Sequence, residues 1–288
     1  MENDHQFLLS LLNDESEQSA ALAMSALLEE SDHGALEEDL RFLQETPDKR
    51  LRKRVHQLQS TISLRRRRPA FSRMLHGAFP LPGEGGEVSG LIDGLIRTHL
   101  LWFDNDSGET LKKHWEKFLA LSKKYSPDSL EEIAFYMRKK KFRCTHKDEL
   151  EPENFCLGSV LADKLGADFM LCALAVELFR HWNRDENYDI HITQAAEKDF
   201  ILVDTQGNIL VPANDWDYIP FEQQYRFEFW EDPALLRYAA MMLFICAAST
   251  DSFRYVFTVG SCLADHPEEP DPIAGLPYPY GKKEEGAP

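Results

Sequence analysis

A continuous apolar stretch in the middle of the chain, Phe169–Trp182, is the strongest element signal in the pattern of hydrophobic and polar residues. Its length and composition predict a buried helix, which Asp168 caps at its start. We expect a shorter helix just before it, beginning at an Asn154 cap and running to about Leu165, with Gly166 closing it in the left-handed conformation. The pattern therefore predicts two packed helices at the centre of the chain.

An antiparallel hairpin is predicted directly after these helices. The runs Phe200–Asp204 and Ile209–Ala213 flank four turn residues, Thr205–Asn208. An aromatic cluster follows, which we expect to pack against the core; any exposed part of it would suit a partner interface. The cluster comprises Trp216, Tyr218, Phe221, Tyr225, Phe227, Phe229 and Trp230.

Residues 5–68 show helical spacing of apolar residues in four successive segments, with turns at 13–16 and at Pro47–Asp48. This pattern predicts two helix pairs. The turns share the elements Leu-Leu-x-Asp and Thr-Pro-Asp, and the pairs resemble degenerate HEAT-type repeats; four amphipathic helices of a simple bundle are the alternative. Since two repeats are too few for a stable solenoid, we expect them to dock on the rest of the chain.

The part of the chain between these regions contains a connection and three further helices. Residues 80–90 are rich in Pro and Gly and predict a flexible connection; they lack the Lys-Ser/Thr ending of a phosphate-binding loop. Helices are expected at 91–103 and 109–124. Ser126 or Asp128 is expected to cap a third helix that reaches Lys140.

The central pattern combines an Asn-led helix start, an apolar helix and a strand that ends in Asp. Its positions are Asn154, Leu157, Val160, Leu161, Gly166, Leu171, Glu177, Phe200, Leu202, Val203 and Asp204. This order resembles the transglutaminase-like superfamily, and within it the bacterial SirB-type family. The resemblance covers the central half of the chain. It implies a mainly helical α+β fold, in which a HEAT-like helical N-terminal region precedes a transglutaminase-like (papain-like) core with a short antiparallel sheet.

The resemblance also implies a domain organisation. Residues 1–70 are the HEAT-like helices, 71–125 a connecting loop and helices, and 126–264 the SirB-type transglutaminase-like domain. Residues 265–288 are acidic and rich in Pro, which predicts a disordered tail.

Catalytic members of this superfamily use a Cys at the start of the central helix, whose pKa the helix dipole and a neighbouring His lower, and an Asp that orients the His. In the register of the resemblance, these three positions hold Met170, Asp199 and Pro212. Losing one essential member of a comparable triad costs on the order of 10⁴- to 10⁶-fold in turnover. The resemblance therefore implies no catalytic residues, and a pseudoenzyme that acts as a non-catalytic interaction or regulatory scaffold.

A cysteine-dependent amidase, protease or transglutaminase is the alternative, with Cys172 as nucleophile and His191 as a displaced base. The apolar neighbours of Cys172 also suit a small buried hydrophobe, and His191 also suits a half-buried strand histidine. The run Cys144-Thr145-His146 resembles half of a zinc site. No second Cys/His pair follows at ligand spacing, so we expect neither a metal nor another cofactor.

A net charge of −17 argues against broad affinity for nucleic acid or an anionic membrane. The charge is uneven, however, and basic runs form a candidate interaction surface: Arg65, Arg66, Arg67, Arg68, Arg138, Lys139, Lys140, Lys141 and Arg143. Phosphate contacts from these runs would indicate a third function, an RNA- or ribosome-associated factor. A solvated face paired with the many Asp and Glu residues is the other interpretation. We expect a protein partner, with nucleic acid as a weaker candidate.

The remaining features predict a cytoplasmic bacterial protein without a membrane partner. The N-terminus lacks the basic and apolar regions of a signal peptide, and the longest apolar candidate, Ala239–Ala248, is shorter than the ~20 residues needed to span a bilayer. The five cysteines are odd in number and unpatterned, which indicates free thiols in a reducing compartment.

Overall fold

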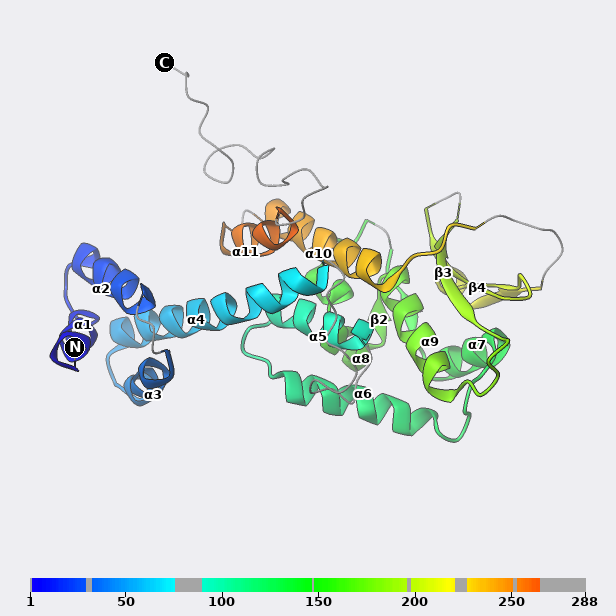
Figure 1. Ribbon diagram of the computed structural model, residues 1–288, viewed down its shortest axis with the longest axis horizontal. Coiled ribbons are helices and arrows are strands. Elements are labelled where there is room, and N and C mark those ends of the chain that lie inside the picture. Colours follow the sequence, from blue (N-terminus) through cyan, green and yellow to red (C-terminus); the bar gives the residue numbers. More distant parts are fainter. Residues whose placement is uncertain are drawn as a thin grey trace, which may run out of the picture. The chain divides into compact units, whose positions relative to one another are not determined.

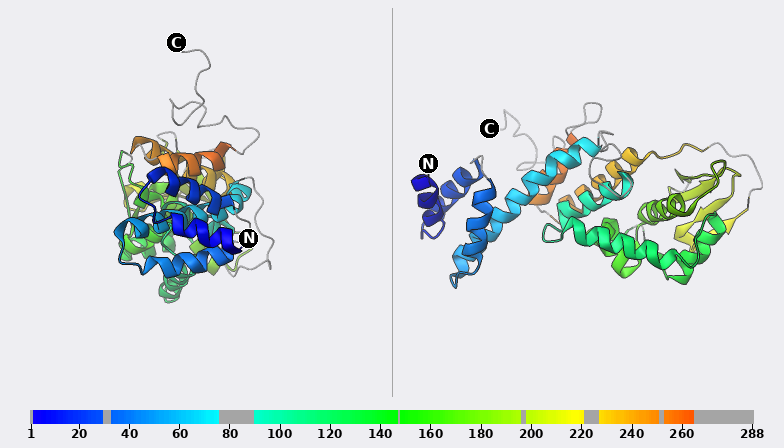
Figure 2. Two further views of the ribbon diagram at one scale, coloured as in Figure 1. Left: turned by 90° about the vertical axis from the view of Figure 1, so that its left-hand side faces the viewer. Right: turned by 60° about the horizontal axis from the view of Figure 1, so that its bottom comes forward.

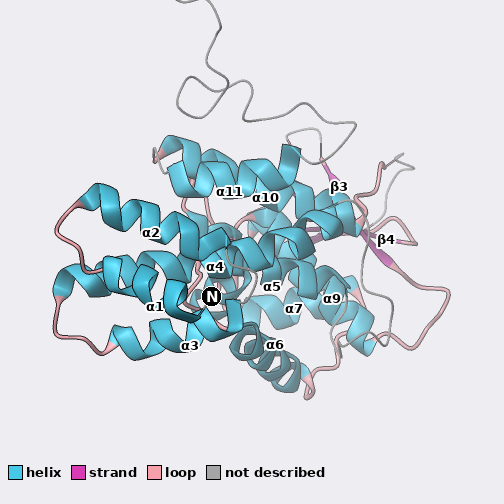
Figure 3. Ribbon diagram, turned by 60° about the vertical axis from the view of Figure 1, so that its left-hand side comes forward, coloured by secondary structure: helices cyan, strands magenta, loops and turns pink. Residues whose placement is uncertain are grey.

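The chain is mainly helical with a small antiparallel sheet, which confirms the expected α+β class (Figures 1 and 3). The computed structural model describes residues 2–29, 33–75, 90–146, 148–195, 198–220, 227–250 and 253–264. Contacts divide the chain into two compact units, Met1–Arg67 and Arg68–Pro288. The first unit ends close to the predicted boundary at residue 70. The predicted tail and nearly all of the predicted connection at 80–90 lie outside the described residues.

Two helix pairs form the first unit, as the apolar spacing predicts. They consist of α1 (Glu2–Leu11), α2 (Glu17–Glu29), α3 (His33–Gln44) and the first part of α4 (Lys49–Leu75). Their shared core contains Leu12, Leu27, Leu36, Leu40, Val55 and Leu58, all wholly buried. Arg54 is buried beside them, and its Nη1 donates hydrogen bonds to the carbonyls of Leu12 and Asp14 at 2.8 and 2.7 Å. This arginine therefore holds α4 to the turn after α1.

Helix α9 (Asp168–Trp182) forms the centre of the second unit, and every side chain from Phe169 to Phe179 is buried. It lies along the sheet, in contact with β3 and β4 (Figures 1 and 2). The other α-helices described here are α5 (Gly90–Trp102), α6 (Gly108–Ser122), α7 (Leu130–Lys139), α8 (Leu157–Asp163), α10 (Asp232–Ser249) and α11 (Phe253–Ala264). Two short 3-10 helices, η1 (Pro152–Phe155) and η2 (Pro212–Asn214), complete the set.

The four-stranded sheet is antiparallel throughout, in the order β3-β4-β5-β6. Its strands are β3 (Ile190–Gln194), β4 (Phe200–Asp204), β5 (Ile209–Val211) and β6 (Asp217–Ile219). The predicted hairpin is β4–β5, and its turn places Gly207 at a φ of 88°. A separate parallel pair joins β1 (Arg143–Cys144) to β2 (Leu165–Gly166), and the sequence pattern did not predict it.

The predicted boundaries of the helix before α9 are wrong at both ends. Asn154 lies in η1, where its Nδ2 donates to the carbonyl of Glu149, and α8 begins only at Leu157. At the other end, Lys164 adopts the left-handed conformation with a φ of 57°. Gly166 belongs instead to β2, where a Cβ would lie 2.8 Å from the side chain of Val160. The glycine is thus explained by close packing rather than by backbone conformation.

The cap of α7 is Ser129, not Ser126 or Asp128. The Ser129 side chain accepts a hydrogen bond from the N–H of Glu132, while the Glu132 carboxylate accepts one from the N–H of Asp128. The two bonds form a reciprocal arrangement close to a capping box. Ser126 precedes it with a φ of 41°.

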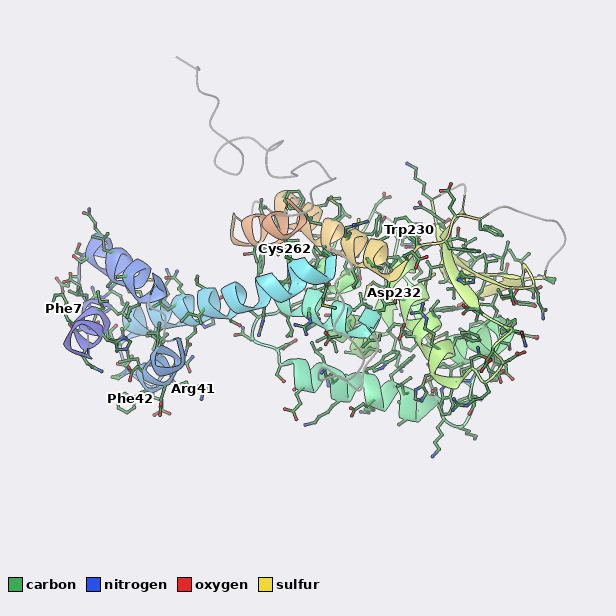
Figure 4. The ribbon with its side chains drawn as sticks, viewed as in Figure 1. Phe7, Arg41, Phe42, Trp230, Asp232 and Cys262 are labelled. Carbon is green, nitrogen blue, oxygen red and sulfur yellow. The ribbon has the colours of Figure 1, made fainter. Side chains whose placement is uncertain are left out.

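Parts of the aromatic cluster belong to the core and parts remain exposed. Trp216 is fully buried, and its indole N–H donates to the carbonyl of Phe142 at 2.9 Å. Phe229 is 47% exposed, whereas Phe221 and Tyr225 lie outside the described residues. Figure 4 labels Trp230 just before α10 and Asp232 at its first residue, and the N–H of Trp230 donates to the carbonyl of Ile192 in β3 at 2.8 Å.

Helix α10 is the one described helix whose length and composition would allow it to cross a membrane. Core helices show the same pattern, however. Leu235, Leu236, Ala239, Ala240 and Leu243 of α10 are all buried.

Candidate functional site

A cavity of about 780 Å³ lies at the N-terminal end of α9. Its wall is formed by β1 and the residues after it, η1, the start of α9, the end of β3, the two residues before β4, η2 and one face of α10. Phe155 and Phe169 contribute stacked rings with centroids 5.9 Å apart, and Tyr238 meets Phe169 edge-on at 5.1 Å. The cavity therefore combines an aromatic lining with the positive end of a helix dipole.

Asp168 connects the two elements that meet at this cavity. One carboxylate oxygen accepts a hydrogen bond from the N–H of Phe169 and the other from the N–H of Phe200, both at 2.8 Å. The first bond satisfies a backbone donor at the start of α9, and the second fixes the start of β4 beside it. Both carboxylate oxygens are thus engaged in holding the helix to the sheet.

The cavity also gathers two of the three regions expected from the superfamily resemblance. Asp199, at the expected His position, lines the wall. Pro212, at the expected Asp position, is buried, and its neighbour Ala213 lines the cavity instead. Met170, at the expected Cys position, is fully buried and does not reach the cavity wall.

Four of the five cysteines are buried. Burial raises the pKa of the Cys172 thiol well above its ordinary value, and the charge of Asp168 adds to the effect. Burial likewise raises the pKa of Cys156, and that of Cys246 to about 11. None of these three thiols meets the requirement for an accessible, activated thiolate.

His191 does not line the cavity, and Cys172 is fully buried in α9. Its ring stacks on Phe229 with centroids 4.4 Å apart, and its Nε2 is 3.8 Å from the carboxylate of Asp189. The structure therefore does not bring Cys172 and His191 together in an open cleft, which the alternative enzyme hypothesis requires.

Cys144 and His146 line the same cavity. The sequence suggested them only as half of a zinc site. Cys144 is half-buried and lines the cavity from β1, and its thiol is 3.4 Å from the carbonyl of Thr145. His146 lines the same wall. Within the described part of the chain, no group of three or more His, Cys, Asp or Glu side chains is arranged to hold a metal ion.

A buried histidine lies outside this cavity and has a structural role. The Nε2 of His99 is 2.8 Å from the carboxylate of Asp106, and its Nδ1 accepts a hydrogen bond from the N–H of Gly158. The Cys156 side chain at the cap position makes no capping bond, so His99 satisfies a donor at the start of α8 instead.

The predicted basic surface divides into parts. Arg138, Lys141 and Arg143 line a second cavity. The Nζ of Lys139 lies over the rings of Tyr125 and Phe135, and that of Lys140 over Tyr125 and Tyr136. In the arginine run, Arg67 is half-buried, and the side chains of Arg65, Arg66 and Arg68 lie outside what the structure describes.

Comparison with known proteins gives no match for this chain, whether against family models, curated proteins or solved structures.

Proposed function

We propose that this chain is a non-catalytic protein with a SirB-type, transglutaminase-like core, preceded by HEAT-like helices, that acts as an interaction or regulatory scaffold. The cleft at the start of its central helix binds a protein partner. The order of a central helix followed by antiparallel strands, with the helix start facing a cavity, supports this assignment.

The engagement of Asp168 carries the proposal. In the superfamily pattern, the start of the central helix presents a thiol to the cleft, because the helix dipole stabilises the thiolate. Here the start of α9 presents a carboxylate with one backbone N–H bonded to each oxygen. No thiol at the start of α9 could therefore serve as the nucleophile of acyl transfer, although a cavity lies at this point.

The lining favours a partner that presents basic residues. Asp148, Glu149, Asp168 and Asp199 contribute four carboxylates to the wall, against the single lysine Lys198. Aromatic rings beside them suit the aliphatic stem and charged end of a Lys or Arg side chain. The net charge of −17 further attracts a cationic partner.

Thiol reactivity tests the absence of catalysis. The native protein is treated with an alkylating reagent across a range of pH, and the modified cysteines are mapped. We expect modification at Cys144 alone among the five, at a rate that rises with pH as for an unactivated thiol. Rapid modification of any cysteine well below its ordinary pKa would contradict the proposal.

Peptide binding tests the cleft. Fluorescence anisotropy with short Lys- and Arg-containing peptides, and with acidic peptides of equal length, is compared between the wild type and Ala213→Trp. Ala213 is exposed at the cavity wall, so the indole should obstruct the cavity without disturbing the core. We expect basic peptides to bind the wild type and to bind the variant at least about tenfold more weakly. Equal binding to both proteins would exclude this cavity as the binding site.

A cysteine-dependent hydrolase is a second candidate, favoured by one observation: Cys144 and His146 line the same cavity. In this case, the nucleophile would come from β1 rather than from α9. An activated Cys144 in the thiol experiment, together with loss of that activation in His146→Ala, would support the hydrolase over the scaffold.

A further inference from the structure

A second cavity, of about 370 Å³, lies at the C-terminal ends of α7 and α8. Four cationic residues line it: Arg138, Lys141, Arg143 and Lys164. Two carboxylates, Asp163 and Asp215, line it as well. Lys164 is separated from the basic run at 138–143 by some twenty residues of sequence, so only the fold reveals the complete set.

Backbone geometry brings these cations together. Helix α7 ends in a Schellman motif, with bonds from the Phe142 N–H to the Met137 carbonyl and from the Lys141 N–H to the Arg138 carbonyl. Lys141 takes the left-handed position of this motif, with a φ of 63°. Helix α8 ends in the simpler αL motif at Lys164, which also has a left-handed backbone and whose N–H donates to the Val160 carbonyl. Both positions are ones that glycine normally occupies.

The strand pair β1–β2 then joins the two helix ends. The N–H of Arg143 donates to the carbonyl of Lys164 at 2.8 Å, which places the strand arginine beside the helix lysine. Because successive strand residues point to opposite sides, Arg143 lines this cavity while Cys144 lines the cavity at α9.

The four cationic side chains of the cavity are not paired with any carboxylate that the structure describes. Among the described residues, none of the four cations lies within 4.0 Å of a carboxylate, in contrast to Arg180, which pairs with Glu177 and Asp232. Cations near helix ends complement the helix dipole, which explains part of the cluster. The helix dipole does not explain Arg143, because this residue belongs to a strand. Several carbonyls at these helix ends are also already bonded to backbone N–H groups and need no cation.

We propose that this cavity binds a small phosphate ester with hydroxyl or amino groups, of the size of a pentose phosphate or a mononucleotide. The guanidinium groups match two phosphate oxygens at once, and the lysines add point charges. Asp163 and Asp215 accept hydrogen bonds from the hydroxyl or amino groups of the ligand. The volume falls within the ~300–1,000 Å³ of ordinary small-molecule sites.

The same two carboxylates disfavour a nucleic-acid strand. A polynucleotide presents a phosphate at every step, and its neighbouring phosphates would meet Asp163, Asp215 and a chain of net charge −17. This inference does not depend on the transglutaminase-like assignment or on the function of the other cavity.

Calorimetric titration of the full chain tests the proposal. The probes are a mononucleotide, a pentose phosphate, inorganic phosphate and the unphosphorylated nucleoside, with a short single-stranded RNA as the competing ligand. We expect a phosphate ester to bind with an affinity that falls as salt is raised, and the nucleoside not to bind. Absence of binding by every phosphate ester at millimolar concentration would overturn the proposal. Tighter binding of the RNA with a steep salt dependence would replace it with a nucleic-acid surface.

Matched variants assign the binding to the cavity. Arg143→Gln and Lys164→Gly each remove one cation, and each should weaken phosphate-ester binding at least about tenfold. Lys164→Gly also replaces a left-handed lysine by the residue that fits this conformation, so its Tm should not fall. Lys139→Gln and Lys140→Gln remove charges of the same run that lie over aromatic rings, and they should leave binding unchanged. Equal losses in both sets would show a general charge effect and contradict a defined site.

Discussion

Asp168 shows how one side chain can determine the geometry of a whole cleft. It lies at the first turn of α9, and its two oxygens bind the N–H groups of Phe169 and Phe200. The bond to Phe200 joins elements that are more than thirty residues apart in sequence. The sequence predicted Asp168 as the helix cap, but the cap is Ala167, which makes no side-chain capping bond, and Asp168 is the first helical residue. The bond to β4 depends on how the strand returns to the helix.

Replacing Asp168 by Ala should destabilise the protein by about 2 to 4 kcal/mol, because two backbone N–H groups lose a charged acceptor. Asp168→Asn retains one acceptor oxygen and should cost about half as much. Urea unfolding monitored by circular dichroism measures both changes. If Asp168→Ala left the unfolding midpoint unchanged, the two bonds would contribute nothing to the join between α9 and β4.

Tyr136 provides a prediction at high pH. Its side chain is fully buried, and burial, together with the charge of Tyr125, raises the pKa of its phenol from 10.0 to about 12. The unfolded chain gives up this proton first, at about pH 10. The stabilising contribution of the protonated phenol is therefore complete below pH 10 and is lost as the pH rises towards 12.

We expect the free energy of unfolding to fall across this interval by up to about 1.4 kcal/mol per pH unit from Tyr136 alone. Tyr136→Phe should show a smaller alkaline loss, although it also removes the hydrogen bond from the phenol to the Phe118 carbonyl. Urea unfolding at several alkaline pH values compares the two proteins. Parallel losses in wild type and variant would mean that the phenol titrates normally in the folded state.

At the scale of elements, local sequence pattern predicts which helices and strands form, whereas packing decides where the helices end. The existence of α9 and of the β4–β5 hairpin follows from local periodicity and from turn residues, and the structure contains both. The end of α8 does not follow in this way. A glycine near a helix end suggests the left-handed residue, yet that residue is Lys164, while Gly166 lets β2 approach Val160.

Two substitutions at this helix end should act in opposite directions. Gly166→Ala places a methyl group 2.8 Å from the branched side chain of Val160 and should cost about 1 to 3 kcal/mol. Lys164→Gly removes the strain of a left-handed lysine and should be neutral or stabilising by up to about 1 kcal/mol. Thermal unfolding of both variants provides the measurement. If Lys164→Gly lowered the Tm strongly and Gly166→Ala left it unchanged, Gly166 would be the residue that ends α8.

At the scale of the whole molecule, the two units have cores of very different size. The apolar cluster of the first unit involves four helices, whereas that of the second contains α9, β4, α10 and much of α5. The most exposed aromatic residues of the described chain lie in the smaller unit, where Phe7 is 61% and Phe42 82% exposed, against 53% for Phe135 of the larger unit (Figure 4). Less buried apolar area per residue means a smaller free energy of opening.

Native-state hydrogen exchange should reveal this difference. Amides of α9 and β4 should exchange slowest, through the largest opening of the second unit, and amides of α1–α3 should exchange through smaller openings. Mass spectrometry of peptides at increasing denaturant separates the two units. Equal protection of α2 and α9 at every denaturant concentration would show that the chain opens as a single cooperative body.

The sequence by itself determined the elements whose signals are local. The helix pairs of the first unit, the buried helix α9 and the β4–β5 hairpin depend on apolar spacing and on turn residues that lie within a few positions of one another. The absence of a cysteine from the first turn of α9, Asp168–Leu171, is likewise read directly from the sequence.

Only the tertiary structure decided which chemical groups meet. The β1–β2 pair, the cavity that brings Cys144 to Asp168 and Asp199, and the addition of Lys164 to the cations of α7 all join segments that are distant in sequence. Such meetings depend on the packing of helix ends and on the backbone hydrogen bonds between them, and no local pattern encodes these.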